Sequence, residues 1–155
     1  MMMLELHNVM IGRNGRSLSM AVTDGQILGL TGAPGTGKTS LLRAILGFIP
    51  VDSGYITIDG ELLTPQSAPY FRQHTAYVPQ HLSVPEGCRD VPVSYLQLLE
   101  KAVQSDKPLL IVDEPSEPLA EEQSAQADRM LRDAANRGAA VVAVNPRITD
   151  NRIQL

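Results

Sequence analysis

The sequence has few of the features that most quickly narrow a protein's class. Its 155 residues include a single cysteine, Cys88, which excludes an internal disulfide and is compatible with a reducing compartment. Its apolar runs all fall well short of the ~20 residues needed to span a bilayer. Its first ten residues, MMMLELHNVM, lack the basic and apolar segments of a secretory signal. We therefore expect one cytoplasmic domain that reaches a membrane only through a partner.

Positive charge is also scarce. The net charge is −4 and the isoelectric point is about 5.3. Neither a nucleic acid nor an anionic membrane surface is therefore expected as a partner. A domain of this length can still bury roughly 70% of the surface that its unfolded chain exposes, so a hydrophobic core is expected.

What the sequence does contain is a regular succession of strand and helix patterns. Apolar residues alternate with polar ones at 4–6 and 18–22, which predicts two half-buried strands separated by a turn at 12–15. Residues 52–61, DSGYITIDGE, predict a hairpin-like strand bounded by glycines. Together these segments predict an N-terminal antiparallel β portion.

The remaining segments alternate between strand and helix. Continuous apolar runs predict strands buried on both faces, and apolar residues three and four apart predict helices. The strands are expected at 26–31, 74–80, 109–112, 139–144 and 151–155, and the helices at 39–46, 93–104 and 119–137. This order predicts an α/β fold with a mostly parallel sheet flanked by helices. Residues 81–92, HLSVPEGCRDVP, fit neither spacing and are expected to form an irregular loop.

A phosphate-binding motif, G-x-x-x-x-G-K-T, occupies residues 32–39 between an expected strand and an expected helix. Its glycines let backbone N–H groups point at phosphate oxygens, and the positive end of the helix adds to the attraction. Lys38 is expected to reach the β- and γ-phosphates, and the Thr39 hydroxyl to bind Mg²⁺. The motif predicts a P-loop NTPase core, with nucleotide-binding residues Gly32, Ala33, Pro34, Gly35, Thr36, Gly37, Lys38, Thr39 and Ser40.

Two carboxylates follow the buried strand at 109–112, in the segment LLIVDEP. Ligands of open parallel sheets bind at the carboxyl ends of the strands, which is where Asp113 is expected to lie. Asp113 is expected to hold Mg²⁺, and Glu114 to orient or deprotonate an attacking water.

The segments around these motifs resemble the ATP-binding subunits of ABC transporters. Residues 4–61 are similar to the opening of that family, from the antiparallel strands through the phosphate loop to the S-G-x-I-x-I-D-G hairpin. AYVPQ resembles the Q-loop, with Gln80 as its glutamine, and LLIVDEP resembles the strand that ends in the catalytic glutamate. The resemblance implies ATP and Mg²⁺ as cofactors, Glu114, Gln80 and Lys38 as catalytic residues, and Thr39, Gln80 and Asp113 as metal ligands.

The resemblance also implies partners. In the family, ATP lies between the phosphate loop of one subunit and the signature motif of another, and the pair powers a membrane permease. We therefore expect an ATP-binding domain that resembles the energy-coupling subunit of a transporter and works at the inner face of a membrane. On its own, the chain is expected to hydrolyse ATP weakly.

The sequence departs from the family pattern at several places. Only residues 81–112 separate Gln80 from Asp113, and no L-S-G-G-Q signature is present. We expect a single domain, 1–155, with its helical subdomain shortened between about 81 and 93. Ala120 stands where the family has the aspartate of the D-loop, and Asn145 where it has the switch histidine.

These departures leave alternatives open. The chain could be a nucleotide-binding module with little or no hydrolysis, either a degenerate partner in a heterodimer or a regulatory subunit. It could also be a shortened form, natural or engineered, of an ordinary subunit. A third reading is an AAA+ ATPase, because GAPGTGKT and the strand before Asn145 also resemble that class.

Overall fold

The computed structural model describes residues 2–11, 16–80, 94–115 and 117–155. The turn expected at 12–15, the irregular loop expected at 81–92 and the expected shortening near 81–93 lie outside these residues. Every strand expected within the described residues is present. Each of the three expected helices is present as well, and the last begins at Glu121, two residues later than expected.

Four strands form an antiparallel sheet in the order β2-β1-β4-β5. Along β1, Leu4 and Leu6 are buried while Glu5 and His7 are partly exposed. This alternation places one face of the sheet against the core and the other toward water, as expected for an antiparallel sheet. The strands are β1 (Met3–Met10), β2 (Leu18–Thr23), β4 (Ser53–Ile58) and β5 (Glu61–Leu62).

Five strands form a second sheet in the order β6-β7-β8-β3-β9, and every neighbouring pair in it is parallel. All residues of β7 and β8 are buried, which explains their continuous apolar sequences. The strands are β3 (Ile27–Thr31), β6 (Thr75–Val78), β7 (Leu109–Val112), β8 (Ala140–Val144) and β9 (Asn151–Gln154).

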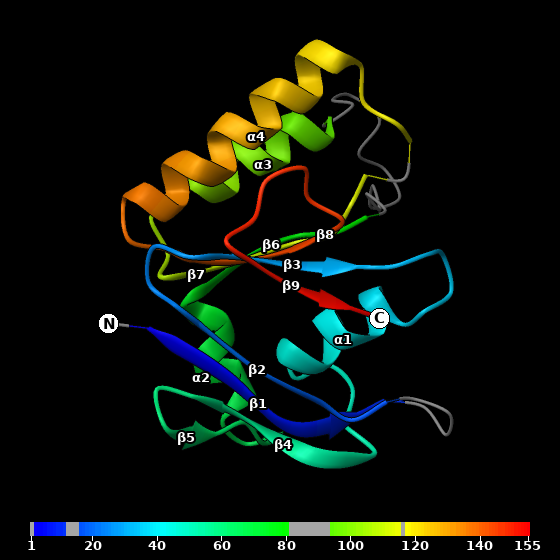
Figure 1. The fold of residues 1–155 in the computed structure, drawn as a ribbon. Helices are drawn as coiled ribbons and strands as arrows, with labels where there is room; N and C mark the ends of the chain where they lie inside the picture. Colours follow the sequence, from blue (N-terminus) through cyan, green and yellow to red (C-terminus); the bar gives the residue numbers. More distant parts are fainter. Residues whose placement is uncertain (1, 12–15, 81–93, 116) are drawn as a thin grey trace, which may run out of the picture.

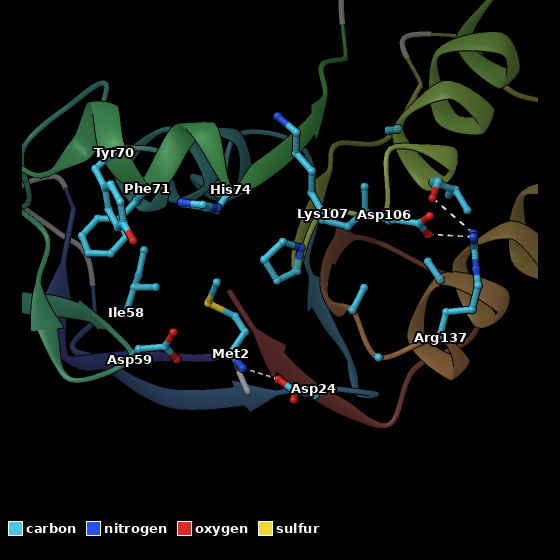
Figure 2. A pocket seen from close by; sticks show the side chains of 17 residues that line it. Met2, Asp24, Ile58, Asp59, Tyr70, Phe71, His74, Asp106, Lys107 and Arg137 are labelled. Atoms are coloured by element: carbon cyan, nitrogen blue, oxygen red, sulfur yellow. Dashed lines mark hydrogen bonds and ion pairs between the residues drawn. The ribbon is translucent and has the colours of Figure 1, made fainter.

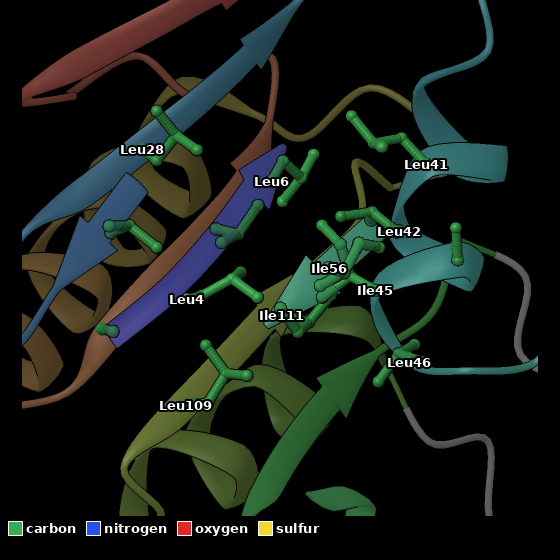
Figure 3. Close-up of a cluster of buried hydrophobic side chains, with 14 of the residues drawn as sticks. Leu4, Leu6, Leu28, Leu41, Leu42, Ile45, Leu46, Ile56, Leu109 and Ile111 are labelled. Carbon is green, nitrogen blue, oxygen red and sulfur yellow. The ribbon is translucent and has the colours of Figure 1, made fainter. Parts of the chain in front are cut away.

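The parallel sheet separates two hydrophobic cores. Figure 1 shows α3 (Tyr95–Gln104) and α4 (Glu121–Asn136) over one face of this sheet, and α1 (Lys38–Ile45) between its other face and the antiparallel sheet. Successive residues of β7 therefore enter different cores. Leu109 and Ile111 join the core beneath α1, in which Leu4 of β1 also lies (Figure 3). Leu110 and Val112 join the core beneath α3 and α4.

One helix was not expected from the sequence. Helix α2 (Ala68–Gln73) has six residues, which is too short for a repeated apolar stripe to be visible in the sequence. It has a proline at its start and buries Ala68 and Phe71. Its C-terminal end leads directly into β6, so α2 helps to fix where that strand begins.

Candidate nucleotide site

Four parallel strands deliver polar residues to one edge of the sheet. Because β3, β6, β7 and β8 run in the same direction, their carboxyl ends lie at the same edge. Gly32 follows β3, Gln80 lies just beyond β6, Asp113 follows β7 and Asn145 follows β8. The fold therefore gathers predicted site residues that are far apart in the sequence.

The phosphate loop connects β3 to α1 in a conformation that its glycines allow. Gly37 is the N-cap of α1 and has a φ of 95°. Residues other than glycine rarely adopt this left-handed backbone conformation. No side chain caps the helix there, so its first N–H groups remain available to an anion. A Cβ atom at Gly32 would lie 2.8 Å from Oγ1 of Thr36 and 3.1 Å from the carbonyl oxygen of Leu155, so a side chain at this position would be crowded.

Lys38 lies inside the loop rather than extending into solvent. It is only 5% exposed. Its Nζ donates hydrogen bonds to the carbonyl oxygens of Gly32 and Ala33 at 2.9 and 2.6 Å, and it lies 3.5 Å from Oγ1 of Thr36. The ammonium group is thus held at the centre of the loop by neutral acceptors, which phosphate oxygens can replace.

Thr39 and Asp113 meet across the boundary between the loop and the sheet. The Thr39 hydroxyl donates to Oδ2 of Asp113 at 2.9 Å, and the backbone N–H of Glu114 donates to Oδ1 at 2.9 Å. Asp113 is 1% exposed. Burial raises the pKa of its carboxyl, against the lowering effect of these hydrogen bonds. Two of the three residues predicted to bind the metal are therefore in direct contact.

Glu114 is held near the loop by Asn145. The Nδ2 group of Asn145 donates to Oε2 of Glu114 at 3.2 Å and to the carbonyl oxygen of Gly32 at 3.3 Å. Its Oδ1 accepts from the backbone N–H of Gly32 at 3.1 Å. Sequence reasoning noted Asn145 as a departure from the family and as a point of similarity to the AAA+ class, but did not include it among the site residues.

Tyr95 is a second residue that sequence reasoning missed. Its hydroxyl donates a hydrogen bond to the carbonyl oxygen of Asp113, so α3 contacts the end of β7 through a polar group. Burial raises the pKa of this hydroxyl, with the carboxylates of Asp113 and Glu114 acting in the same direction. In the sequence Tyr95 is part of the helical apolar stripe, and nothing in the sequence indicates the contact.

Gln80 lies at the same edge and is partly buried. The backbone N–H of Asp113 donates to the carbonyl oxygen of Val78 at 2.9 Å, which extends the pairing of β6 with β7 to the end of both strands. Gln80 follows two residues later. Its roles as a metal ligand and a catalytic residue remain predictions.

A cavity lies at the amino edge of the parallel sheet, opposite the edge that carries the predicted site residues. It has a volume of about 540 Å³ and lies between α2, the antiparallel sheet and the C-terminal ends of α3 and α4. Figure 2 shows Met2 and Asp59 on one side of it and Tyr70 and His74 on the other. All residues predicted for nucleotide or metal binding lie at the carboxyl edge, away from this cavity.

Among the described residues, no helix is both long enough and apolar enough to cross a lipid bilayer. This agrees with the short apolar runs of the sequence.

Comparison with known proteins links these features to one family. The family model described as "ABC transporter" matches residues 16–92, about half of the chain. The Fe(3+) ions import ATP-binding protein FbpC 2 of Pectobacterium atrosepticum is 38% identical over 84 residues, which are 50% of this chain and 24% of that protein. The manganese transport system ATP-binding protein MntB of Listeria innocua is 34% identical over 67 residues, 43% of this chain and 26% of that protein. The chain thus spans about a quarter of the length of these relatives.

Solved structures extend the similarity of fold to nearly the whole chain. A structure described as the ATP-binding subunit of an ABC transporter has a TM-score of 0.79 at 17% identity and covers 99% of this chain and 85% of its own. A putative ABC transporter ATP-binding protein from Pyrococcus furiosus has a TM-score of 0.73 at 15% identity and covers 99% and 97%. The matched family model shows that the chain belongs to the ABC transporter ATP-binding family. The phosphate loop and the contact between Thr39 and Asp113 agree with this assignment.

Proposed function

We propose that this chain binds Mg·ATP at the carboxyl edge of its parallel sheet and hydrolyses it to power a membrane transporter. The observation that carries the proposal is the 2.9 Å hydrogen bond between Thr39 and Asp113, which joins the phosphate loop to the end of β7. Family membership implies ATP as the nucleotide. Its phosphates would lie against the backbone of residues 32–40, and Lys38 would exchange its carbonyl acceptors for phosphate oxygens.

The residues at this edge fit Mg²⁺. This ion takes oxygen ligands, and in nucleotide sites it uses one or two protein ligands beside water and phosphate oxygens. Thr39 donates its hydroxyl hydrogen to Asp113, which leaves the lone pairs of the hydroxyl oxygen for a cation. The part of the chain that the structure describes holds no cluster of three or more His, Cys, Asp or Glu side chains. Thr39, Asp113 and Gln80 would therefore act together with the phosphates.

Glu114 is the residue we assign to water activation. Bound Mg²⁺ would neutralise part of the negative charge on the phosphates. The water oxygen forms a bond to the γ-phosphorus, the bond from that phosphorus to the bridging oxygen breaks, and the water proton passes to the Glu114 carboxylate. ADP leaves with the bridging oxygen, and inorganic phosphate carries the oxygen of the water.

The proposed partners are a membrane permease and a second ABC subunit with an intact signature. Two relatives are named as parts of an iron import system and a manganese transport system. Their names support a transport role for this chain without indicating its substrate. We place the chain at the inner face of a membrane, held there by the permease.

The proposal is tested by measuring ATP affinity by calorimetry with and without Mg²⁺. Thr39→Val preserves the shape of the side chain and removes its hydroxyl, so we expect Mg²⁺ to strengthen ATP binding in the wild type but not in this variant. Thr57→Val is the matched control, because Thr57 lies in β4 of the antiparallel sheet, away from the carboxyl edge. The proposal would be contradicted if the wild-type chain bound no ATP, or if it bound ATP equally well with and without Mg²⁺.

A further inference from the structure

Asn145 is fixed in place from both sides. Its backbone N–H donates to the carbonyl oxygen of Leu30 at 2.8 Å, which continues the pairing of β8 with β3. Two residues later, Arg147 forms ion pairs of 3.1 Å with Asp128 and 3.0 Å with Glu121, both in α4. The side chain of Asn145 is therefore presented at the carboxyl edge by a backbone that is held by a strand and a helix.

The backbone conformation of Asn145 is an unusual one. Its φ is 46°, in the left-handed region, where asparagine is tolerated better than most residues. Residues held in such conformations occur often at functional sites, where the surrounding structure maintains them. Here the conformation brings the carboxamide to Gly32 and Glu114 at once.

The pattern of donors and acceptors requires a carboxamide. The backbone N–H of Gly32 can only donate, so the oxygen of the Asn145 side chain must face it. The NH₂ group then faces the two acceptors, the carbonyl oxygen of Gly32 and Oε2 of Glu114. An aspartate would retain the acceptor and lose the donor, and an alanine would lose both.

Without this contact, Glu114 has few constraints on its direction. It is only partly buried, and its neighbour Asp113 carries a carboxylate as well. A free glutamate side chain samples several rotamers, and ordering it costs conformational entropy. The Asn145 contact orders the Glu114 carboxylate before the nucleotide arrives and directs it toward Gly32, the first residue of the phosphate loop.

We propose that Asn145 is a positioning residue, which holds the Glu114 carboxylate beside the phosphate loop so that it can receive the proton of the attacking water. The inference rests on the hydrolysis proposed above. It adds that an uncharged carboxamide, rather than a titratable side chain, sets the direction of the base in this protein.

The first test separates the rate of hydrolysis from the affinity for ATP. Radiolabelled phosphate release with protein in excess gives a maximal rate and a half-saturating concentration. We expect Asn145→Ala to lower the maximal rate by ~10-fold or more, about the effect of one lost hydrogen bond to a charged group, and to change half-saturation less. Asn145→Asp should lower the rate at least as much, because it places a second carboxylate opposite Glu114.

Asn8→Ala provides the matched control. Asn8 is another asparagine with positive φ, 50°, and its Oδ1 accepts from the Ser19 hydroxyl at 3.2 Å in the antiparallel sheet. This variant should lower the melting temperature and leave the maximal rate unchanged. A loss of rate in Asn8→Ala equal to that in Asn145→Ala would show that general destabilisation explains both, and would overturn the inference.

The decisive measurement is a double-mutant cycle with Glu114→Gln. If Asn145 acts through Glu114, Asn145→Ala should reduce the rate of the wild type ~10-fold and the rate of Glu114→Gln hardly at all. Equal reductions in both backgrounds, or no reduction in the wild type, would overturn the role of Asn145 and leave the proposed function intact. A wild-type rate that Glu114→Gln does not lower would instead refute the proposed hydrolysis.

Discussion

The two sheets of this protein differ in how they use their faces and their ends. In the antiparallel sheet, buried and exposed residues alternate along β1, so one face packs on the core and the other meets water. In the parallel sheet, β7 and β8 are buried throughout, and polar residues begin directly after the strands, at Asp113 and Asn145. The residues predicted to bind the nucleotide and the metal lie at the carboxyl edge of the second sheet, and the first sheet supplies none of them.

The difference explains why the predicted site residues are concentrated in so small a region. Parallel strands buried on both faces cannot carry polar side chains along their length, since an unpaired buried polar group is costly. They can carry them where the strands end. All predicted metal and nucleotide ligands lie in the loop after β3, in the first turn of α1, or just beyond β6 and β7.

The largest expected effect is on the rate of ATP hydrolysis by the chain without a partner subunit. We expect the isolated chain to hydrolyse ATP ~10³–10⁵-fold more slowly than a complete site, the range found when a cationic group that stabilises the transition state is missing. The reason is that the sequence holds no L-S-G-G-Q signature and has Asn145 in place of the switch histidine. Steady-state phosphate release measures the rate, with Glu114→Gln as the control.

Adding an ABC subunit with an intact signature should raise this rate, with Lys38 and Glu114 supplied by the present chain. A Glu114-dependent rate of about 1 s⁻¹ or more from the chain alone, near the lower end of typical enzyme values, would show that this edge is sufficient without a partner.

The next effect concerns the stability that each sheet provides. Ile111 is fully buried in β7, so Ile111→Ala should lower the free energy of unfolding by ~2–5 kcal/mol, through lost burial and the cavity left behind. Leu62→Ala in β5 is the comparison, because Leu62 is 51% exposed and should change stability by no more than about 0.5 kcal/mol. Urea unfolding at constant temperature measures both. Equal losses would contradict the placement of Ile111 in the buried core and of Leu62 at the surface.

The third effect compares the two edges of the parallel sheet. Lys38→Ala removes a charge-assisted contact with the phosphates, worth ~1.5–3 kcal/mol, so ATP affinity should fall ~10-fold or more. Lys107→Ala is the matched control, because Lys107 lines the cavity at the amino edge, and it should leave ATP affinity unchanged. Calorimetry gives both values. The assignment of ATP to the carboxyl edge would be wrong if only the second substitution weakened binding.

Much of this organisation could be predicted from the sequence because it depends on local pattern. The run ILGL, the glycine-rich loop and the helix after Lys38 occur in the order that a phosphate site needs, and LLIVDEP places Asp113 at a strand end. These inferences need only the periodicity of strands and helices. The contact between Thr39 and Asp113 is also implied, since both residues lie at the same edge of one parallel sheet.

The contacts of Asn145 and Tyr95 could not be predicted in the same way. Asn145 reaches Gly32 because β8 pairs with β3, and it reaches Glu114 because β8 also pairs with β7. Hydropathy gives the existence of these strands but not their order in the sheet. Likewise, the hydroxyl of Tyr95 contacts Asp113 only because α3 packs over β7, whereas its ring fits the apolar stripe of the helix.

The smallest expected effect lies at the amino edge of the parallel sheet, where Asp150 ties β9 to β3. Its Oδ2 accepts from the backbone N–H of Ile27 at 2.8 Å, and Arg132 of α4 lies 3.2 Å away. Asp150→Asn should lower the free energy of unfolding at pH 7 by ~1 kcal/mol, toward the low end for a hydrogen bond to a charged group, because the Arg132 ion pair is more than a third exposed. Asp106→Asn, which breaks the exposed ion pair with Arg137, should cost no more than about 0.5 kcal/mol.

The pH dependence distinguishes Asp150 from an ordinary surface acid. The hydrogen bond from Ile27, followed by the contact with Arg132, lowers the pKa of the Asp150 carboxyl in the folded state. A lowered folded-state pKa means that its stabilisation is fully present above the unfolded value, ~3.9, and is lost as the pH falls through the folded-state value. Urea unfolding of the wild type and Asp150→Asn should therefore differ by a constant amount at neutral pH and converge below pH ~4. If the difference persisted undiminished at the lowest pH at which the protein folds, the shape of the substituted amide would explain the lost stability. The negative charge of Asp150 would then contribute nothing to the free energy of unfolding.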